Sequence, residues 1–210
     1  MKTTIKLFTL LFVLFAFVSC SDDDEGPNLI AVESNTASNI PAPQTGGQGQ
    51  PVGGDFTKFS FATGAVTTSD TEWDLAFRGT TIALNGGAVT GTADEPARNG
   101  NGGVSIQTGT FASITSADGL TFNQDADGAF AIPTGSDNGW YNYNPQLFLV
   151  TPIPGQIFVI RTHDGKYAKV EFLSYYENAP ANPDAMSDPS RFYTFNYTYN
   201  PNDGETTLAL

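Results

Sequence analysis

The feature that most constrains the fold of this chain is a strict two-residue alternation near its C-terminus. The segment RFYTFNYTYN (191–200) carries aromatic rings at positions 193, 195, 197 and 199, and Thr or Asn at the positions between them. Successive side chains of a β-strand point to opposite faces of its sheet, so this pattern places the four rings on one face. The segment is therefore predicted to be a β-strand with one buried face.

Short runs of similar character recur along the chain, separated by turns rich in Gly, Asn and Asp. In EWDLAFRGTTIALNGG (72–87), Trp73, Leu75 and Phe77 alternate with Asp, Ala and Arg before an Asn-Gly turn. The other predicted strands are 56–61, 82–84, 157–160, 166–176 and 206–210. No window has the apolar periodicity and capping residues of an amphipathic helix. These short, closely spaced strands predict an all-β fold, an antiparallel sandwich or a barrel-like domain.

The single histidine of the chain, His163, stands beside an Asp-Gly pair at 164–165, which is a strong two-residue hairpin signal. In that register His163 faces Lys166 across the turn, and Val159 opposes Val170 farther along the hairpin. We therefore predict that His163 flanks the turn and is accessible to solvent. A role as a metal ligand stays open, since imidazole is a common ligand.

The N-terminal segment MKTTIKLFTLLFVLFAFVSC has two lysines, an apolar run from 7 to 18, and a cysteine at position 20. This pattern predicts a signal peptide at 1–19 and a bacterial lipobox whose Cys20 is acylated. Residues 20–50 are rich in Asp, Ser, Pro, Gln and Gly, and they are predicted to form a flexible tether. The remaining residues, 51–210, fit one domain.

The charge of the chain limits its partners. Without the signal peptide, seven Lys and Arg remain against 22 Asp and Glu, which gives a net charge of −15. This charge argues against nucleic acid as a partner and against adsorption to anionic lipid, so the acyl anchor is the predicted membrane attachment. The acidic run SDDDE directly after Cys20 resembles the surface-export signal of Bacteroidetes lipoproteins; a polar tether with periplasmic anchoring is the alternative.

Catalytic and metal-binding chemistry find little support in the residue types available. The predicted domain has one His and no Cys, too few for a zinc site, and no serine stands in a nucleophile elbow. Asp125 and Asp127 in NQDADGAF, and Asp203 and Glu205 in NDGET, resemble fragments of calcium loops. Neither fragment has the alternating ligand set, and turn chemistry explains both. We therefore predict a binding protein and not an enzyme.

Aromatic residues are the side chains of this sequence best suited to bind a ligand. Most of the rings belong in a core, but GWYNYNP (139–145) packs three of them into an Asn- and Pro-rich segment. Trp140, Tyr141 and Tyr143 are therefore candidate pocket residues. The alternative is a strand entry with two rings pointing inward.

Four segments resemble the HmuY family of Bacteroidetes lipoproteins. They are EWDLAFRGTTIALNGG (72–87), GWYNYNP (139–145), IPGQIFVIRTHDGKYAKVEFLSYY (153–176) and YTFNYTYNP (193–201). The resemblance implies a hand-like all-β fold in a single domain at 51–210. It also implies a hemophore anchored to the outer membrane and exposed at the cell surface. Such a protein takes heme from host hemoproteins and passes it to a TonB-dependent outer-membrane receptor.

The resemblance also raises the question of the axial ligands of heme iron, which are pairs of His or pairs of Met in known members. His163 and Met186 are the single His and Met that remain after signal removal. The predicted strand 166–176, about 35 Å long, runs between them, and the loop after it would have to fold back almost its full length for the two to meet. Met186 in its polar loop is therefore the better single candidate, and a Tyr oxygen is a further possibility. The alternative function is a lipoprotein of the same fold that recognises another porphyrin, a glycan or a protein partner.

Overall fold

The computed structural model describes residues 28–47 and 49–210. The predicted signal peptide, Cys20 and the acidic run at 21–25 lie outside the described residues. Within the described part of the chain, no helix is both long enough and apolar enough to cross a membrane.

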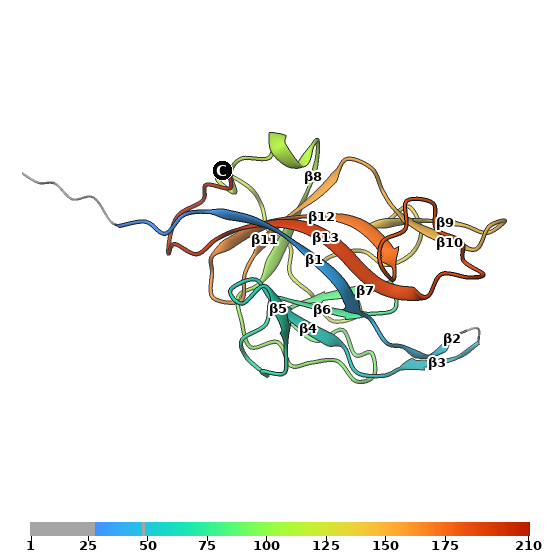
Figure 1. The fold of residues 1–210 in the computed structure, drawn as a ribbon. Helices are drawn as coiled ribbons and strands as arrows, with labels where there is room; N and C mark the ends of the chain where they lie inside the picture. Colours follow the sequence, from blue (N-terminus) through green and yellow to red (C-terminus); the bar gives the residue numbers. More distant parts are fainter. Residues whose placement is uncertain (1–27, 48) are drawn as a thin grey trace, which may run out of the picture.

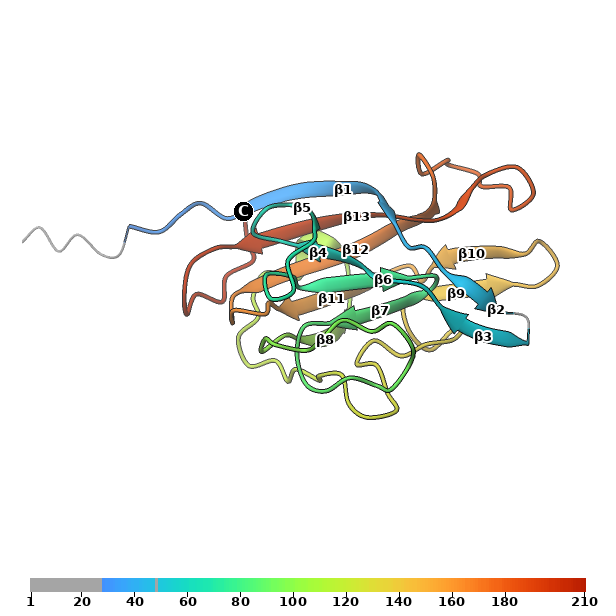
Figure 2. The same ribbon diagram turned by 90° about the horizontal axis from the view of Figure 1, so that it is seen from below.

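Two antiparallel sheets pack face to face, as Figures 1 and 2 show from two directions. The larger sheet has the order β1 (Glu33–Pro41), β13 (Ser190–Asn200), β12 (Tyr167–Tyr176), β11 (Gln156–Arg161) and β8 (Gly103–Thr108). The smaller sheet has the order β5 (Ala65–Thr67), β4 (Thr57–Ser60), β6 (Leu75–Arg78) and β7 (Thr81–Leu84). Two hairpins stand apart from the sheets: β2 (Thr45–Gly47) with β3 (Gln50–Gly53), and β9 (Tyr141–Asn144) with β10 (Leu149–Pro152). The prediction of an all-β antiparallel fold is confirmed.

The core lies between the two sheets and is built largely from aromatic rings. The alternation in β13 buries Tyr193, Phe195 and Tyr197 on the face that meets the smaller sheet. Phe59 of β4 packs edge-to-face against Phe195, with ring centroids 5.3 Å apart, and Phe77 of β6 lies 4.6 Å from Tyr193. Edge-to-face and tilted ring pairs contribute beyond their buried area, so this interface holds the two sheets in register.

The outer face of the larger sheet is covered by a loop that carries the 3-10 turn η1 (Phe111–Ser113). Lys169 of β12 fastens this loop, because its ammonium donates to the carbonyls of Phe111 and Ile114 at 2.8 Å. The ammonium also lies 4.6 Å from the centroid of the Phe111 ring. Burial lowers the pKa of Lys169.

The outer face of the smaller sheet is covered by the loop between β7 and β8. A buried ionic network holds this loop, in which Arg98 pairs with Glu95 at 2.8 Å and with Asp125 at 2.9 Å. The Arg98 guanidinium also lies over the ring of Trp73. All three charged side chains are almost inaccessible to solvent. Burial of a charge is costly unless it is paired with an opposite charge, and here each charge is paired.

The predicted flexible tether over 20–50 is wrong for the part that forms β1 and β2. β1 pairs with β13 along its length, from Glu33 opposite Tyr199 to Pro41 opposite Phe192. The side chains of Ala37 and Ile40 in β1 are buried. An edge strand needs only a few apolar side chains, because the neighbouring strand supplies its backbone hydrogen bonds. A strand of largely polar composition therefore cannot be recognised from its sequence pattern alone.

The predicted register of the hairpin at 164–165 is also wrong, by one residue. Val159 pairs with Lys169, and the amide of Thr162 donates to the carbonyl of Lys166 at 2.9 Å. The turn therefore has three residues, and it ends at Gly165 with φ of 92°. A glycine in the left-handed region at the end of a three-residue loop is a common hairpin closure.

The long strands give the domain two ends. We call the end with the β11–β12 turn, Ile30 and Pro201 the proximal end, because the described chain begins there (Figure 1). We call the opposite end the distal end; it is formed by the β2–β3 hairpin, the β9–β10 hairpin and the loop 177–189. β12, with ten residues, spans roughly 30 Å between the two ends.

Candidate functional site

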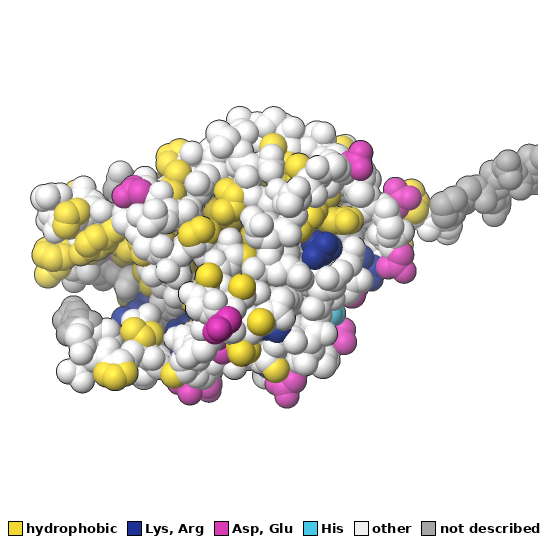
Figure 3. Space-filling model, turned by 180° about the vertical axis from the view of Figure 1, so that it is seen from behind, with side chains coloured by type: hydrophobic (Ala, Val, Ile, Leu, Met, Phe, Trp, Pro, Cys, Tyr) yellow, Lys and Arg dark blue, Asp and Glu magenta, His cyan; other side chains and the backbone are white. Residues whose placement is uncertain are grey.

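Large apolar side chains are exposed on all three segments of the distal end. Figure 3 shows hydrophobic side chains on two projections of this end, with a hollow between them and Lys or Arg side chains at its base. The exposed residues are Val52, Tyr143, Leu147, Phe148 and Met186. Single exposed apolar residues are ordinary on protein surfaces, but several of them on the segments that form one end of the domain, which is also hollowed, indicate a candidate binding site.

The β9–β10 hairpin holds its apolar tip outward through local backbone bonds. The side-chain oxygen of Asn144 accepts hydrogen bonds from the amides of Gln146 and Leu147 at 3.0 and 3.1 Å. Phe148 has a φ of 55°, in the left-handed region that a residue with a bulky side chain rarely adopts. Its side chain is 61% exposed. The hairpin therefore maintains a strained turn that keeps an aromatic ring in solvent.

An aromatic cluster lies at the base of the β9–β10 hairpin, around Trp140, which directly precedes β9. The Trp140 ring lies 4.8 Å from Tyr193 and 5.6 Å from Tyr175, measured between centroids. The Trp140 indole N–H donates to the carbonyl of Thr80 at 2.8 Å, and the side chain is 1% exposed. Trp140 is thus a core residue and does not line a pocket. Tyr141 is also buried, and the exposed ring of the predicted trio is Tyr143.

Arg191 brings a positive charge to this aromatic cluster. It is the second residue of β13 and has a φ of 70°, and its guanidinium donates to the carbonyl of Gln44, just before β2, at 2.8 Å. Burial raises the pKa of Tyr175 strongly, and the adjacent Arg191 guanidinium opposes that rise. Sequence analysis did not single out Arg191, since nothing in RFYTFNYTYN marks its first residue as part of a site.

The loop 177–189 is pinned at its base and exposed at its tip. Asn39 and Asn178 exchange hydrogen bonds: the Asn178 amide donates to the Asn39 side chain at 2.7 Å, and the Asn39 side chain donates back at 3.0 Å. The Met186 amide donates to Asp184, while the Met186 residue is 84% exposed. The thioether of Met186 is therefore available to a ligand at the distal end.

His163 lies at the proximal end and is held by the smaller sheet. Its Nδ1 lies 2.7 Å from the Asp74 carboxylate, which also accepts the His163 backbone N–H at 3.0 Å. The side chain is 12% exposed, so the prediction of a solvent-accessible residue is wrong. The Asp74 hydrogen bond raises the pKa of His163. Since β12 separates His163 from the loop of Met186, the two side chains do not share one iron.

The predicted calcium fragments have other roles. The Asp125 carboxylate pairs with Arg98 and accepts the backbone N–H groups of Leu84 and Ala131 at 3.0 and 2.8 Å. Burial raises its pKa. Asp203 is an exposed partner of Lys166 at 3.5 Å. Over residues 28–47 and 49–210, no three His, Cys, Asp or Glu side chains cluster as metal ligands.

Comparison with known proteins settles the family. The family model for the HmuY protein matches residues 54–197, about two thirds of the chain. The chain belongs to the HmuY family. No curated protein sequence matches it.

Three solved bacterial structures resemble the chain to different degrees. The chain resembles an apo HmuY analog of Tannerella forsythia, with a TM-score of 0.51 and 12% identity over 83% of this chain and 100% of that one. A predicted HmuY-like heme-binding protein of Bacteroides vulgatus gives a TM-score of 0.44 and 16% identity over 79% and 90% of the two chains. A predicted lipoprotein of Bacteroides fragilis gives a TM-score of 0.43 and 14% identity over 83% of this chain and 94% of that one. The first of these similarities supports the fold.

Proposed function

We propose that this HmuY-family protein binds heme or a related porphyrin in the hollow of its distal end. The observation that carries the proposal is the set of exposed apolar side chains on the segments of the distal end, together with a hollow that has Lys or Arg side chains at its base (Figure 3). A porphyrin is a flat apolar ring with two carboxylates. Leu147 and Phe148 would contact its faces, and the Arg191 guanidinium would pair with a carboxylate, for which its planar fork is well suited.

Tyr143 and Met186 are the candidate axial ligands, because both are exposed at the distal end. Tyrosine and methionine both occur as heme-iron ligands. His163 is not a candidate for this hollow, since it lies at the proximal end against Asp74. The protein would thus ligate iron without histidine.

The scarcity of iron ligands favours a second candidate function, the binding of a porphyrin through its ring and carboxylates alone. In that case metal-free protoporphyrin binds about as tightly as ferric heme. Both functions are binding roles without catalysis.

The cellular role that we propose follows from the family and from the predicted lipobox. Acylated Cys20 would anchor the protein to the outer membrane, with its domain at the cell surface. It would take heme from host hemoproteins and deliver it to a TonB-dependent receptor.

A heme titration of the soluble mature chain, residues 21–210, tests the proposal. We expect a shift of the Soret band that saturates at micromolar protein with ferric or ferrous heme. Met186→Ala should weaken binding and alter the ferrous spectrum, and Leu147→Ala should weaken binding to heme and to protoporphyrin alike. Val66→Ala is the matched control, because Val66 is an exposed apolar residue of the edge strand β5. Absence of any saturable shift with either ligand would refute porphyrin binding.

A further inference from the structure

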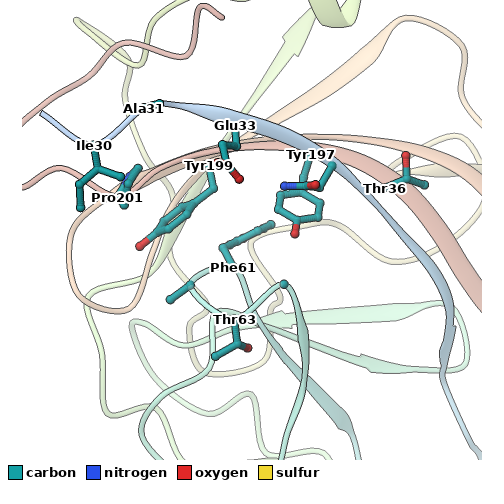
Figure 4. A pocket seen from close by; sticks show the side chains of 12 residues that line it. Ile30, Ala31, Glu33, Thr36, Phe61, Thr63, Tyr197, Tyr199 and Pro201 are labelled. Carbon is teal, nitrogen blue, oxygen red and sulfur yellow. The ribbon is translucent and has the colours of Figure 1, made fainter.

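Two hollows of the surface differ in the chemistry of the residues that line them. The hollow of Figure 4, about 500 Å³ in volume, lies between β1, the end of β13 and the turn 61–64, and no described residue of its lining belongs to an Asn-Gly pair. A hollow of about 770 Å³ lies among the loops 90–92, 128–130 and 133–138, and Asn138, which precedes Gly139, lines it. An asparagine side chain reacts most readily with its own backbone when glycine follows, because glycine has no Cβ to hinder the approach. The second hollow therefore brings solvent to a chemically reactive pair.

Three of the four Asn-Gly pairs of the chain are held by hydrogen bonds; the pairs are 85–86, 99–100, 101–102 and 138–139. Asn85 is fully buried, and its side chain donates to two backbone carbonyls at 2.9 and 3.0 Å. The same side chain accepts the amide of Gly100 at 3.0 Å, and the Asn85 carbonyl accepts the amide of Gly102 at 2.8 Å. In each of these pairs the side chain or the following backbone nitrogen is engaged, so a reaction between them requires local opening.

The fourth pair lacks these restraints. Asn138 is exposed at the end of the turn that precedes β9, and neither its carboxamide nor the Gly139 backbone N–H forms a hydrogen bond with any of the described residues. The glycine cannot be exchanged, since an added Cβ at Gly139 would collide with the carbonyl oxygen of Pro133. The packing at this position therefore requires the residue that makes the pair reactive.

We propose that Asn138 is a site of spontaneous deamidation. The backbone nitrogen of Gly139 attacks the Cγ atom of Asn138, and the new C–N bond closes a succinimide ring. The Cγ–Nδ2 bond breaks, and the side-chain nitrogen leaves as ammonia with the proton of the attacking amide. Water then opens the ring at either carbonyl, which gives aspartate or isoaspartate. One water is consumed and one ammonia is released, and the chain gains one negative charge without an oxidant or a cofactor.

The isoaspartate product lengthens the backbone at the base of the β9–β10 hairpin. The Asp137 amide donates to the Tyr141 carbonyl at 2.9 Å, and the Tyr143 amide donates to the Ser136 hydroxyl at 2.8 Å. These two bonds fold the chain back on itself across residues 138–140. An extra methylene in the backbone at position 138 therefore loosens both bonds, and with them the start of β9.

Incubation of the soluble mature chain at pH 8 and 37 °C, followed by peptide mapping with chymotrypsin and mass spectrometry, tests the site. Chymotrypsin cleaves after aromatic residues and Leu, so it releases peptide 131–140, in which Asn138 is the only asparagine, and peptide 85–111, which carries the other three pairs. We expect peptide 131–140 to be deamidated at least about tenfold faster than peptide 85–111, because an opening free energy of only about 1.4 kcal/mol slows a reaction tenfold. In urea the four pairs should react at similar rates, which controls for the effect of sequence alone.

Two variants and one exchange measurement complete the test. Asn138→Gln should abolish the modified form of peptide 131–140, because glutamine closes the corresponding larger ring far more slowly. Asn101→Gln is the matched control and should leave that modification unchanged. In the deamidated fraction, separated by anion exchange, the amides of Asp137 and Tyr143 should exchange faster with solvent while β13 keeps its protection.

Several outcomes would overturn the proposal. Equal rates for the two peptides of the folded chain, or an unmodified peptide 131–140 when the chain in urea reacts, would overturn the assignment of Asn138. Unchanged exchange of the Asp137 and Tyr143 amides in the deamidated fraction would overturn the effect on the hairpin. None of these results depends on heme, so they are independent of the porphyrin titration.

Discussion

Replacement of His163 by Ala isolates a charged hydrogen bond that joins the two sheets. His163 belongs to the β11–β12 turn of the larger sheet, and Asp74 directly precedes β6 of the smaller one. In the variant, Asp74 still accepts the backbone N–H groups of residue 163 and of Phe61, so the carboxylate is not left without donors. The stability lost in the variant therefore measures the contribution of the imidazole side chain itself. The second carboxylate near the ring, Glu72, is largely exposed and contributes little.

The magnitude depends on pH because the Asp74 hydrogen bond raises the pKa of His163 in the folded state. A raised folded pKa means that the stabilisation is fully present below the unfolded value of about 6.5 and is lost as pH rises through the folded pKa. At pH 5.5 the charged bond contributes about 2 kcal/mol, and at pH 9 the neutral bond contributes about 1 kcal/mol. His163→Ala should therefore destabilise the protein by about 2 kcal/mol at the lower pH and by about half of that at the higher.

Urea unfolding of the soluble mature chain at pH 5.5 and pH 9, followed by tryptophan fluorescence, measures both values. The wild-type protein and the variant should differ most at pH 5.5, and the difference should shrink at pH 9. A difference that is equal at the two pH values, or larger at pH 9, would refute the assignment of a charged His163–Asp74 bond.

Three further predictions concern stability. Trp140→Ala should lower the free energy of unfolding by about 3–5 kcal/mol, because a buried indole is lost, whereas Met186→Ala should change it by less than about 0.5 kcal/mol; urea unfolding compares them directly. Arg98→Met should cost about 3–5 kcal/mol, because it leaves two buried carboxylates without their cation; a melting temperature close to that of the wild type would contradict this. Lys169→Met should accelerate amide exchange in the segment 109–116 while β12 and β13 keep their protection, and uniform acceleration would argue against a local fastening role.

The strands that can be predicted from the sequence are those in which apolar and polar residues alternate within the strand itself. The alternating rings of β13 identify a strand because their burial follows from local pattern alone. β1 carries no such signal, since its pairing depends on a partner more than 150 residues away, as Ala37 opposite Phe195 illustrates. The hairpin register failed for a related reason: a single left-handed glycine, Gly165, decides between a two-residue and a three-residue turn.

The candidate site was less predictable than the fold. The aromatic segment at 139–145 does lie at the candidate site, but its residues differ in burial: Trp140 is in the core and Tyr143 is exposed to solvent. Arg191 joins the site only because β13 begins beside Gln44, a contact between positions 147 residues apart. Residue types indicate which chemistry is available, whereas long-range pairing decides which side chains meet.

β1 has a mechanical consequence. The described chain begins at Asn28, at the proximal end, and runs from there into β1 (Figure 1). Tension applied at this point would pull β1 lengthwise past β13, so that the hydrogen bonds between the two strands would bear the load together rather than break one after another. Under the proposed acyl anchor, a domain held at this end would resist extraction in shear, and the proposed porphyrin site would stay unloaded at the far end of the molecule.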